Sequence, residues 1–146
     1  MKTYSNKDFT LSKENGINTL ITRDNLKTSF GSFKVSITLW DQKINNEILI
    51  SELNDLIVYF SNHFEDVIDI VYKSYQMGYD ENINEIMGFP NNIEKLDVHT
   101  IIEEQHLFVE SEVGEISKRI YFSIPWDCEH GLYLEPNNTS WEIVDV

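Results

Sequence analysis

The chain has 146 residues and a mass of 17.1 kDa, enough for one domain with a continuous core and too short for two. Apolar residues form 41% of it, which argues against disorder, and no apolar run approaches the roughly 18 residues of a membrane-spanning helix. The formal net charge is −14, so nucleic acid, with its phosphate backbone, is a poor candidate partner.

The acidic residues are unevenly distributed along the chain. Residues 1–43 hold seven Lys/Arg against four Asp/Glu, whereas residues 44–146 hold four against twenty-one. The first segment therefore carries +3 and the second −17. The single cysteine, Cys128, cannot form a disulfide within the chain, and the polar start does not resemble a signal peptide. We expect a cytoplasmic protein without a membrane anchor or a cofactor.

The first third of the chain has the patterns of β-strands. Asn15-Gly16 separates residues 9–11 from residues 17–21, and this dipeptide tolerates the positive φ angles of a tight hairpin turn. Apolar and polar residues then alternate from Phe33 to Leu39, as in a strand with one buried face. The sequence predicts a hairpin followed by a longer strand.

After Ser51 the apolar period lengthens from two residues to three or four, which predicts a helix. The apolar stripe expected in the core consists of Leu53, Leu56, Ile57, Phe60, Phe64, Val67, Ile68, Val71 and Tyr75. We expect Ser51 to cap the helix and Gly78 to end it. Ser61-Asn62 could divide the segment, but the stripe keeps its phase across them. One long or gently broken helix is predicted.

Extended patterns return after a loop at residues 80–92. Alternation around Leu107 leads to a hairpin turn at Val113-Gly114, and Ile120, Phe122, Ile124 and Trp126 are expected on one face of the returning strand. Short strands follow at residues 132–134 and 141–146, joined by a turn. Residues 1–146 are thus predicted to form a single α+β domain, an antiparallel sheet or meander covered by the amphipathic helix.

The predicted helix also has features of a partner-binding face. It carries more apolar side chains than one buried stripe needs, and acidic residues border them. The candidate partner-binding residues are Tyr59, Glu65, Asp66, Asp69 and Tyr72. Such a surface would attract a basic protein.

A second candidate site is the segment at residues 126–131, which concentrates reactive side-chain types. It consists of Trp126, Asp127, Cys128, Glu129, His130 and Gly131. In an extended segment Cys128 and His130 share a face but lie about 7 Å apart, which opposes thiol catalysis. A metal site would need Asp127, Glu129 and His130 together with His99 or His106. The favoured interpretation is a structural turn, with Gly131 at a positive φ angle, and neither a catalytic nor a metal-binding residue is assigned.

At this segment the chain resembles a family of small bacterial domains of uncharacterised function that are associated with toxin and immunity gene loci. The resemblance rests on Trp126, Asp127, Glu129, His130, Gly131 and Leu132 and covers mainly the last third of the chain. It implies a β/helix/β domain and no known catalytic residues. Cys128 and the acidic excess lie outside the shared pattern.

Three functions are compatible with these features. The first is a non-enzymatic acidic binding protein, an immunity-type inhibitor of a basic toxin. The second is a small metal-dependent or acid/base enzyme centred on residues 126–131. The third is a structural subunit that assembles through the apolar side chains of its helix. The sequence leaves the partner and the oligomeric state undetermined.

Overall fold

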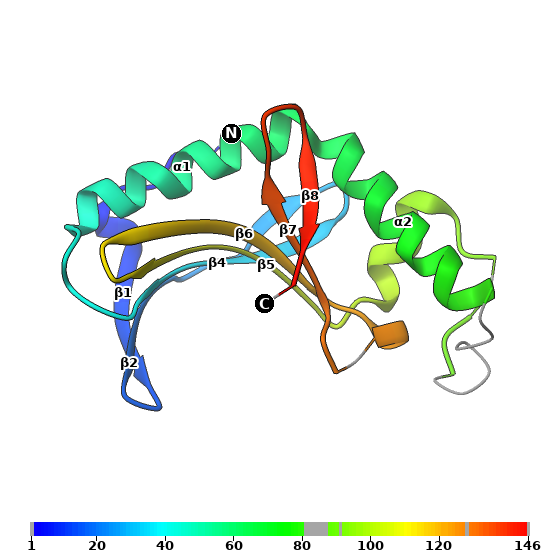
Figure 1. Cartoon of the computed structure of the whole chain (residues 1–146), viewed down its shortest axis with the longest axis horizontal. Helices are drawn as coiled ribbons and strands as arrows, with labels where there is room; N and C mark the ends of the chain where they lie inside the picture. Colours follow the sequence, from blue (N-terminus) through cyan, green and yellow to red (C-terminus); the bar gives the residue numbers. More distant parts are fainter. Residues whose placement is uncertain (1, 81–87, 91, 128, 146) are drawn as a thin grey trace.

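The protein is an open β-sheet with two helices laid end to end along one face (Figure 1). The computed structural model describes residues 2–80, 88–90, 92–127 and 129–145. The strands of the described residues are β1 (Phe9–Glu14), β2 (Ile17–Thr22), β3 (Leu26–Thr28), β4 (Gly31–Leu39), β5 (Glu104–Glu112), β6 (Glu115–Ser123), β7 (Leu132–Pro136) and β8 (Trp141–Val144). The helices are α1 (Asn46–Asn62) and α2 (Phe64–Asp80), with short 3-10 helices η1 (Asn6–Asp8), η2 (Lys95–Ile101) and η3 (Pro125–Asp127). The predicted α+β class is confirmed.

The strand order is β1-β2-β4-β5-β6-β7-β8, and β3 pairs with β4 outside this path. All pairs are antiparallel except β4 and β5, which are parallel. A parallel pair needs a crossover connection, and here α1, α2 and η2 lie between the two strands in the chain. The antiparallel meander was predicted from the sequence, whereas the parallel pair in its centre was not.

Both predicted hairpin turns are present. Asn15 and Gly16 have φ angles of 51° and 79°, and Val113 and Gly114 have φ angles of 54° and 74°. Two successive positive φ angles give the twist that a two-residue hairpin needs. These turns connect β1 to β2 and β5 to β6.

The helix is broken, but its ends differ from those predicted. The break is at His63, with φ −124° and ψ 31°, beside the predicted Ser61-Asn62. The N-cap is Asn45, whose side chain accepts a hydrogen bond from the backbone N of Ile48 at 3.0 Å, so the expected Ser51 cap was wrong. No helix among the described residues is both long and apolar enough to span a membrane.

Gly78 does not end the helix; it lies buried within α2. A Cβ atom at this position would lie 2.7 Å from the Cβ of Trp126, closer than two carbon atoms can pack. The glycine therefore allows α2 to approach the η3 turn, and close packing instead of helix termination explains its presence.

The core lies between α1 and the sheet. Phe60 of α1 packs edge to face on Phe33 of β4, with ring centroids 5.1 Å apart, and Phe33 in turn contacts Phe122 of β6 at 5.9 Å. Phe60 and Val67 are buried as predicted. Phe64 is only partly buried, because it directly follows the break and packs on the outer side of Phe60. The prediction that Phe64 lies in the core was therefore only partly right.

Candidate functional site

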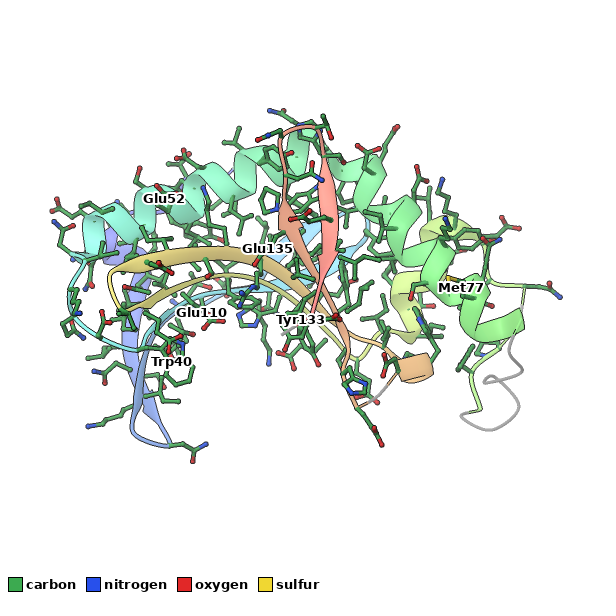
Figure 2. The ribbon with its side chains drawn as sticks, viewed as in Figure 1. Trp40, Glu52, Met77, Glu110, Tyr133 and Glu135 are labelled. Carbon is green, nitrogen blue, oxygen red and sulfur yellow. The ribbon has the colours of Figure 1, made fainter. Side chains whose placement is uncertain are left out.

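The face of the sheet opposite the helices is not covered by any described element. Figure 2 shows Trp40, Glu110 and Tyr133 on this side, away from α1. Strand pairing aligns its side chains in rows, so that Phe108 lies beside Arg119 and Glu135 lies opposite Glu142. We call this surface the open face and define it by Trp40, Glu110, Arg119, Tyr121, Tyr133, Glu135 and Glu142, with the buried Phe108 beneath them.

Arg119 lies between two carboxylates on the open face. Its Nε donates to Oε1 of Glu135 at 2.7 Å, and its Nη1 lies 3.6 Å from Oε1 of Glu110. The other oxygen of Glu110 accepts a hydrogen bond from the indole Nε1 of Trp40 at 2.6 Å. All three charged side chains are more than two-thirds buried. The contacts therefore hold the indole and the charges in fixed positions, with one more negative charge than positive.

Glu142 increases this excess of negative charge. It lies directly opposite Glu135 on the neighbouring strand and is exposed. Like charges at directly opposite positions destabilise a sheet. Arg119 compensates Glu135, but no described Lys or Arg forms an ion pair with Glu142.

Aromatic rings border these carboxylates. The rings of Tyr121 and Tyr133 pack with centroids 4.7 Å apart, and Trp40 is 49% exposed. Burial raises the pKa of the Tyr133 phenol, the neighbouring Tyr121 and Glu110 raise it further, and Arg119 opposes them. Tyr133 is therefore neutral at physiological pH. Aromatic faces next to carboxylates suit an ammonium or guanidinium group.

A serine–histidine pair lies on the same face, nearer to β2. Nε2 of His106 is 2.7 Å from Oγ of the buried Ser36, and both side chains line a cavity of about 400 Å³. Burial lowers the pKa of His106 to about 4, Glu104 opposing this effect and Lys34 adding to it. The imidazole is therefore neutral but a weak base. No described group binds its Nδ1, so the pair satisfies two buried polar groups and lacks the third group that orients a catalytic histidine.

This histidine makes stability depend on pH. Its pKa is about 6.5 when unfolded and about 4 when folded, so between these values the unfolded chain binds more protons. The contribution of His106 to the free energy of unfolding should therefore be complete above about pH 6.5. It should fall by roughly 2–3 kcal/mol as the pH drops to about 4. Urea unfolding of the wild type and His106→Gln across this range tests it. A constant difference between the two would contradict the burial of a neutral imidazole.

The segment at residues 126–131 forms a turn, as favoured, but β6 ends at Ser123, so the expected placement of Ile124 and Trp126 on this strand was wrong. Pro125–Asp127 is a 3-10 turn, and Oδ1 of Asp127 accepts from the backbone N of His130 at 3.3 Å and lies 3.1 Å from its Nδ1. Gly131 has a φ angle of 71°. The predicted positive φ angle of Gly131 is confirmed, and Asp127 accepts a backbone hydrogen bond within the turn. Cys128 lies outside the described residues.

The turn also borders a groove between α2 and β8, with a volume of about 730 Å³. Trp126 is buried beside it, and its indole Nε1 donates to Oγ of Ser74 on α2 at 2.8 Å. The residues that line the groove include Met77, Ile124, Trp126, Asp127, His130, Leu132, Ile143 and Asp145. Its lining is therefore mostly apolar, with two carboxylates and no lysine or arginine among the described residues.

The residues considered as alternative metal ligands are not all brought together. His99 packs edge to face on Phe30, and His106 lies on the open face beside Ser36. Asp127 and His130 pair with each other, and Glu129 is exposed. Among the described residues, no three His, Cys, Asp or Glu side chains form a group that could hold a metal ion.

The aromatic residues of the predicted helical partner face are used within the molecule. Tyr59 donates from its hydroxyl to the carbonyl O of Asn137 at 2.7 Å and packs on Trp141. Tyr72 stacks on the buried Tyr75 and packs against the core. Both rings therefore make contacts within the fold and remain partly exposed, and their role in partner binding stays a prediction.

The acidic residues of that predicted face have different environments. Asp66 accepts a hydrogen bond from Oγ of Ser140 at 2.7 Å, and Asp69 forms an ion pair with Lys95. Glu65 is exposed. Two of the three carboxylates therefore hold α2 to neighbouring segments.

No protein-family model, curated protein or solved structure matches this chain. The resemblance at residues 126–131 therefore stays a prediction, and function has to be inferred from the geometry.

The open face as a whole could not be predicted from the sequence. The alternation of apolar and polar residues predicted a solvent-exposed side for each strand. It did not indicate that Glu110, Arg119 and Glu135 would meet across three strands. One part of the face could have been predicted. Glu135 and Glu142 lie equally far from the two ends of the turn at residues 137–140, so a hairpin with this turn pairs them.

Proposed function

We propose that this chain is a non-enzymatic acidic binding protein that holds a basic protein partner on its open face. The observation that carries the proposal is Glu142, a carboxylate without a described cationic partner, placed opposite Glu135 beside aromatic rings. A lysine or arginine of a partner would relieve the repulsion between the two carboxylates and lie near the ring of Tyr133.

The composition of the face supports this function. Protein interfaces are enriched in tyrosine, tryptophan and arginine, and the open face combines Trp40, Tyr121, Tyr133 and Arg119. The contacts that fix Trp40 and Arg119 reduce the side-chain entropy lost on binding. The charge of −17 on residues 44–146 would attract a basic partner and accelerate its association.

The specific form that we propose is an immunity-type inhibitor of a basic toxin. The sequence resemblance at residues 126–131 favours this form, and the acidic open face provides a surface that could cover a basic active site. No catalytic group of the chain is required for this function, because a bound inhibitor acts by occlusion.

The test compares two double charge reversals in affinity purification from the native host. Glu135→Lys/Glu142→Lys alters the open face, and Glu65→Lys/Asp69→Lys alters α2 on the other side of the sheet. Both change the formal net charge from −14 to −10. We expect a basic protein that the wild type and the α2 variant retain and the open-face variant loses, with a loss of affinity on the order of a hundredfold.

Association rates at two ionic strengths then test the electrostatic part. Added salt should slow association with the wild type more than with the open-face variant. Recovery of the same proteins by all three forms, or loss only with the α2 variant, would refute the open-face proposal.

A further inference from the structure

Strand β8 forms one end of the sheet and has an unpaired edge. It is the last strand in the sheet order and pairs only with β7. Among the described residues, no backbone hydrogen bond reaches its outer side. Edge strands of this kind present N–H and C=O groups that another extended segment can pair with.

The two sides of β8 differ in chemistry. Glu142 projects over the open face with Glu135, whereas Ile143 projects to the other side, with Leu134. Ile143 is 60% exposed and lines the α2–β8 groove, together with Met77, which is 57% exposed. A strand added to β8 would therefore place alternate side chains over an acidic surface and over an apolar one.

The charge of the groove restricts its occupant further. Asp145 and Asp127, which contacts His130 of the same lining, are the carboxylates among its described residues, and no lysine or arginine lies among them. Apolar side chains in the groove would thus be compatible with basic residues next to them in sequence, and acidic neighbours would be repelled.

We infer that β8 binds an extended segment of a basic protein in which basic and apolar residues alternate. The segment pairs with the outer edge of β8, directs its basic side chains toward Glu142 and Glu135, and inserts its apolar side chains between Met77, Ile143 and Trp126. The inference rests on the proposed function, because it describes how the basic partner of the open face reaches around the edge of the sheet.

A short, charged edge strand also protects a protein from pairing with copies of itself. Glu142 on β8 and Asp145 directly after it would repel the same strand of a second copy. The same charges do not repel a basic strand. The edge is therefore selective in the sign of the charge that it admits, and this selectivity is the property that the test measures.

The probe is an eight-residue peptide in which lysine alternates with leucine or phenylalanine. Its controls are a peptide of the same composition with the lysines in one block and two alternating peptides with N-methylated backbone amides, at the lysines in one and at the apolar residues in the other. We expect the alternating peptide to bind on the order of tenfold more tightly than the block peptide. Each methylated peptide lacks the N–H donors of one of its two edges. The peptide methylated on the edge that pairs with β8 should lose the tenfold advantage, and the other should keep it. Bound peptide should slow hydrogen exchange at the outward amides of Trp141–Val144.

Two variants with equal charge changes locate the site. Ile143→Lys should weaken binding of the alternating peptide on the order of tenfold, whereas Leu11→Lys should change it less than twofold. Leu11 is the matched control, because it is also 60% exposed and lies on β1 at the opposite end of the sheet. Equal effects of the two variants, or equal affinity for alternating, block and both methylated peptides, would overturn the inference.

The outcomes separate this inference from the proposed function. If the natural partner is lost with Glu135→Lys/Glu142→Lys but retained by Ile143→Lys, the open face binds it without strand addition and the inference fails alone. If the peptide pairs with β8 but no natural basic partner depends on Glu135 and Glu142, the proposed function fails.

Discussion

Replacing Phe60 with alanine is expected to lower the free energy of unfolding by about 3–5 kcal/mol, because a buried aromatic ring is lost where the structure cannot collapse. Phe60 is almost fully buried between α1 and the sheet. Its ring contacts Phe33 at 5.1 Å, Phe64 at 5.2 Å and Trp141 at 6.5 Å between centroids. It thus joins the first helix, the second helix and the last strand.

Phe64→Ala is the matched control for this substitution. The same ring is removed four residues later on the same apolar stripe, but Phe64 is only partly buried. We expect it to cost less than half as much as Phe60→Ala. Urea unfolding of both variants measures the difference. Equal costs would mean that the two rings are equally buried and that the break at His63 does not turn Phe64 outward.

Gly131→Ala is expected to destabilise the protein by about 3 kcal/mol through two separate effects. The φ angle of 71° is unfavourable for a residue with a Cβ atom by about 1 kcal/mol. A Cβ atom would also lie 2.9 Å from the carbonyl O of Phe122 and nearer still to the ring of Tyr121, an overlap that adds about 2 kcal/mol. The turn at residues 126–131 would have to move away from β6.

Gly16→Ala separates the two effects. Gly16 has a φ angle of 79°, but a Cβ atom there would meet nothing within 4 Å. It should therefore cost only the backbone term of about 1 kcal/mol. Thermal or urea unfolding of the two variants gives the difference. If Gly131→Ala proves no more costly than Gly16→Ala, close packing of the turn on Tyr121 is not what requires glycine at this position.

The sequence by itself determined the elements whose signals are local. Alternation from Phe33 to Leu39 identified β4, and the dipeptides Asn15-Gly16 and Val113-Gly114 identified two hairpins, because neighbouring residues set the φ angles of a tight turn. The 3.6-residue stripe identified the helical segment but kept its phase across the break, and only Ser61-Asn62 indicated a possible division next to His63. Composition and period also sufficed for the α+β class.

The position of Gly78 within α2 and the end of β6 depended on tertiary contacts. Glycine is favoured at the ends of helices, but Gly78 lies within α2, because the helix packs closely on Trp126, 48 residues away in sequence. The predicted strand extended to Trp126, but β6 ends at Ser123, and the indole is buried with its Nε1 donating to Ser74 on α2. In both cases a contact distant in sequence outweighed the local propensity.

The candidate site was decided by tertiary structure alone. Glu110, Arg119 and Glu135 meet because β5, β6 and β7 are neighbours in one particular register, and a shift of one residue would move each side chain to the other face. The parallel pairing of β4 with β5 brings Ser36 to His106 across 70 residues of chain. The period of apolar residues indicates which face of a strand is buried, and turn residues indicate where a hairpin closes. Strand order and register follow from the packing of the whole sheet against α1, and no local pattern encodes this packing.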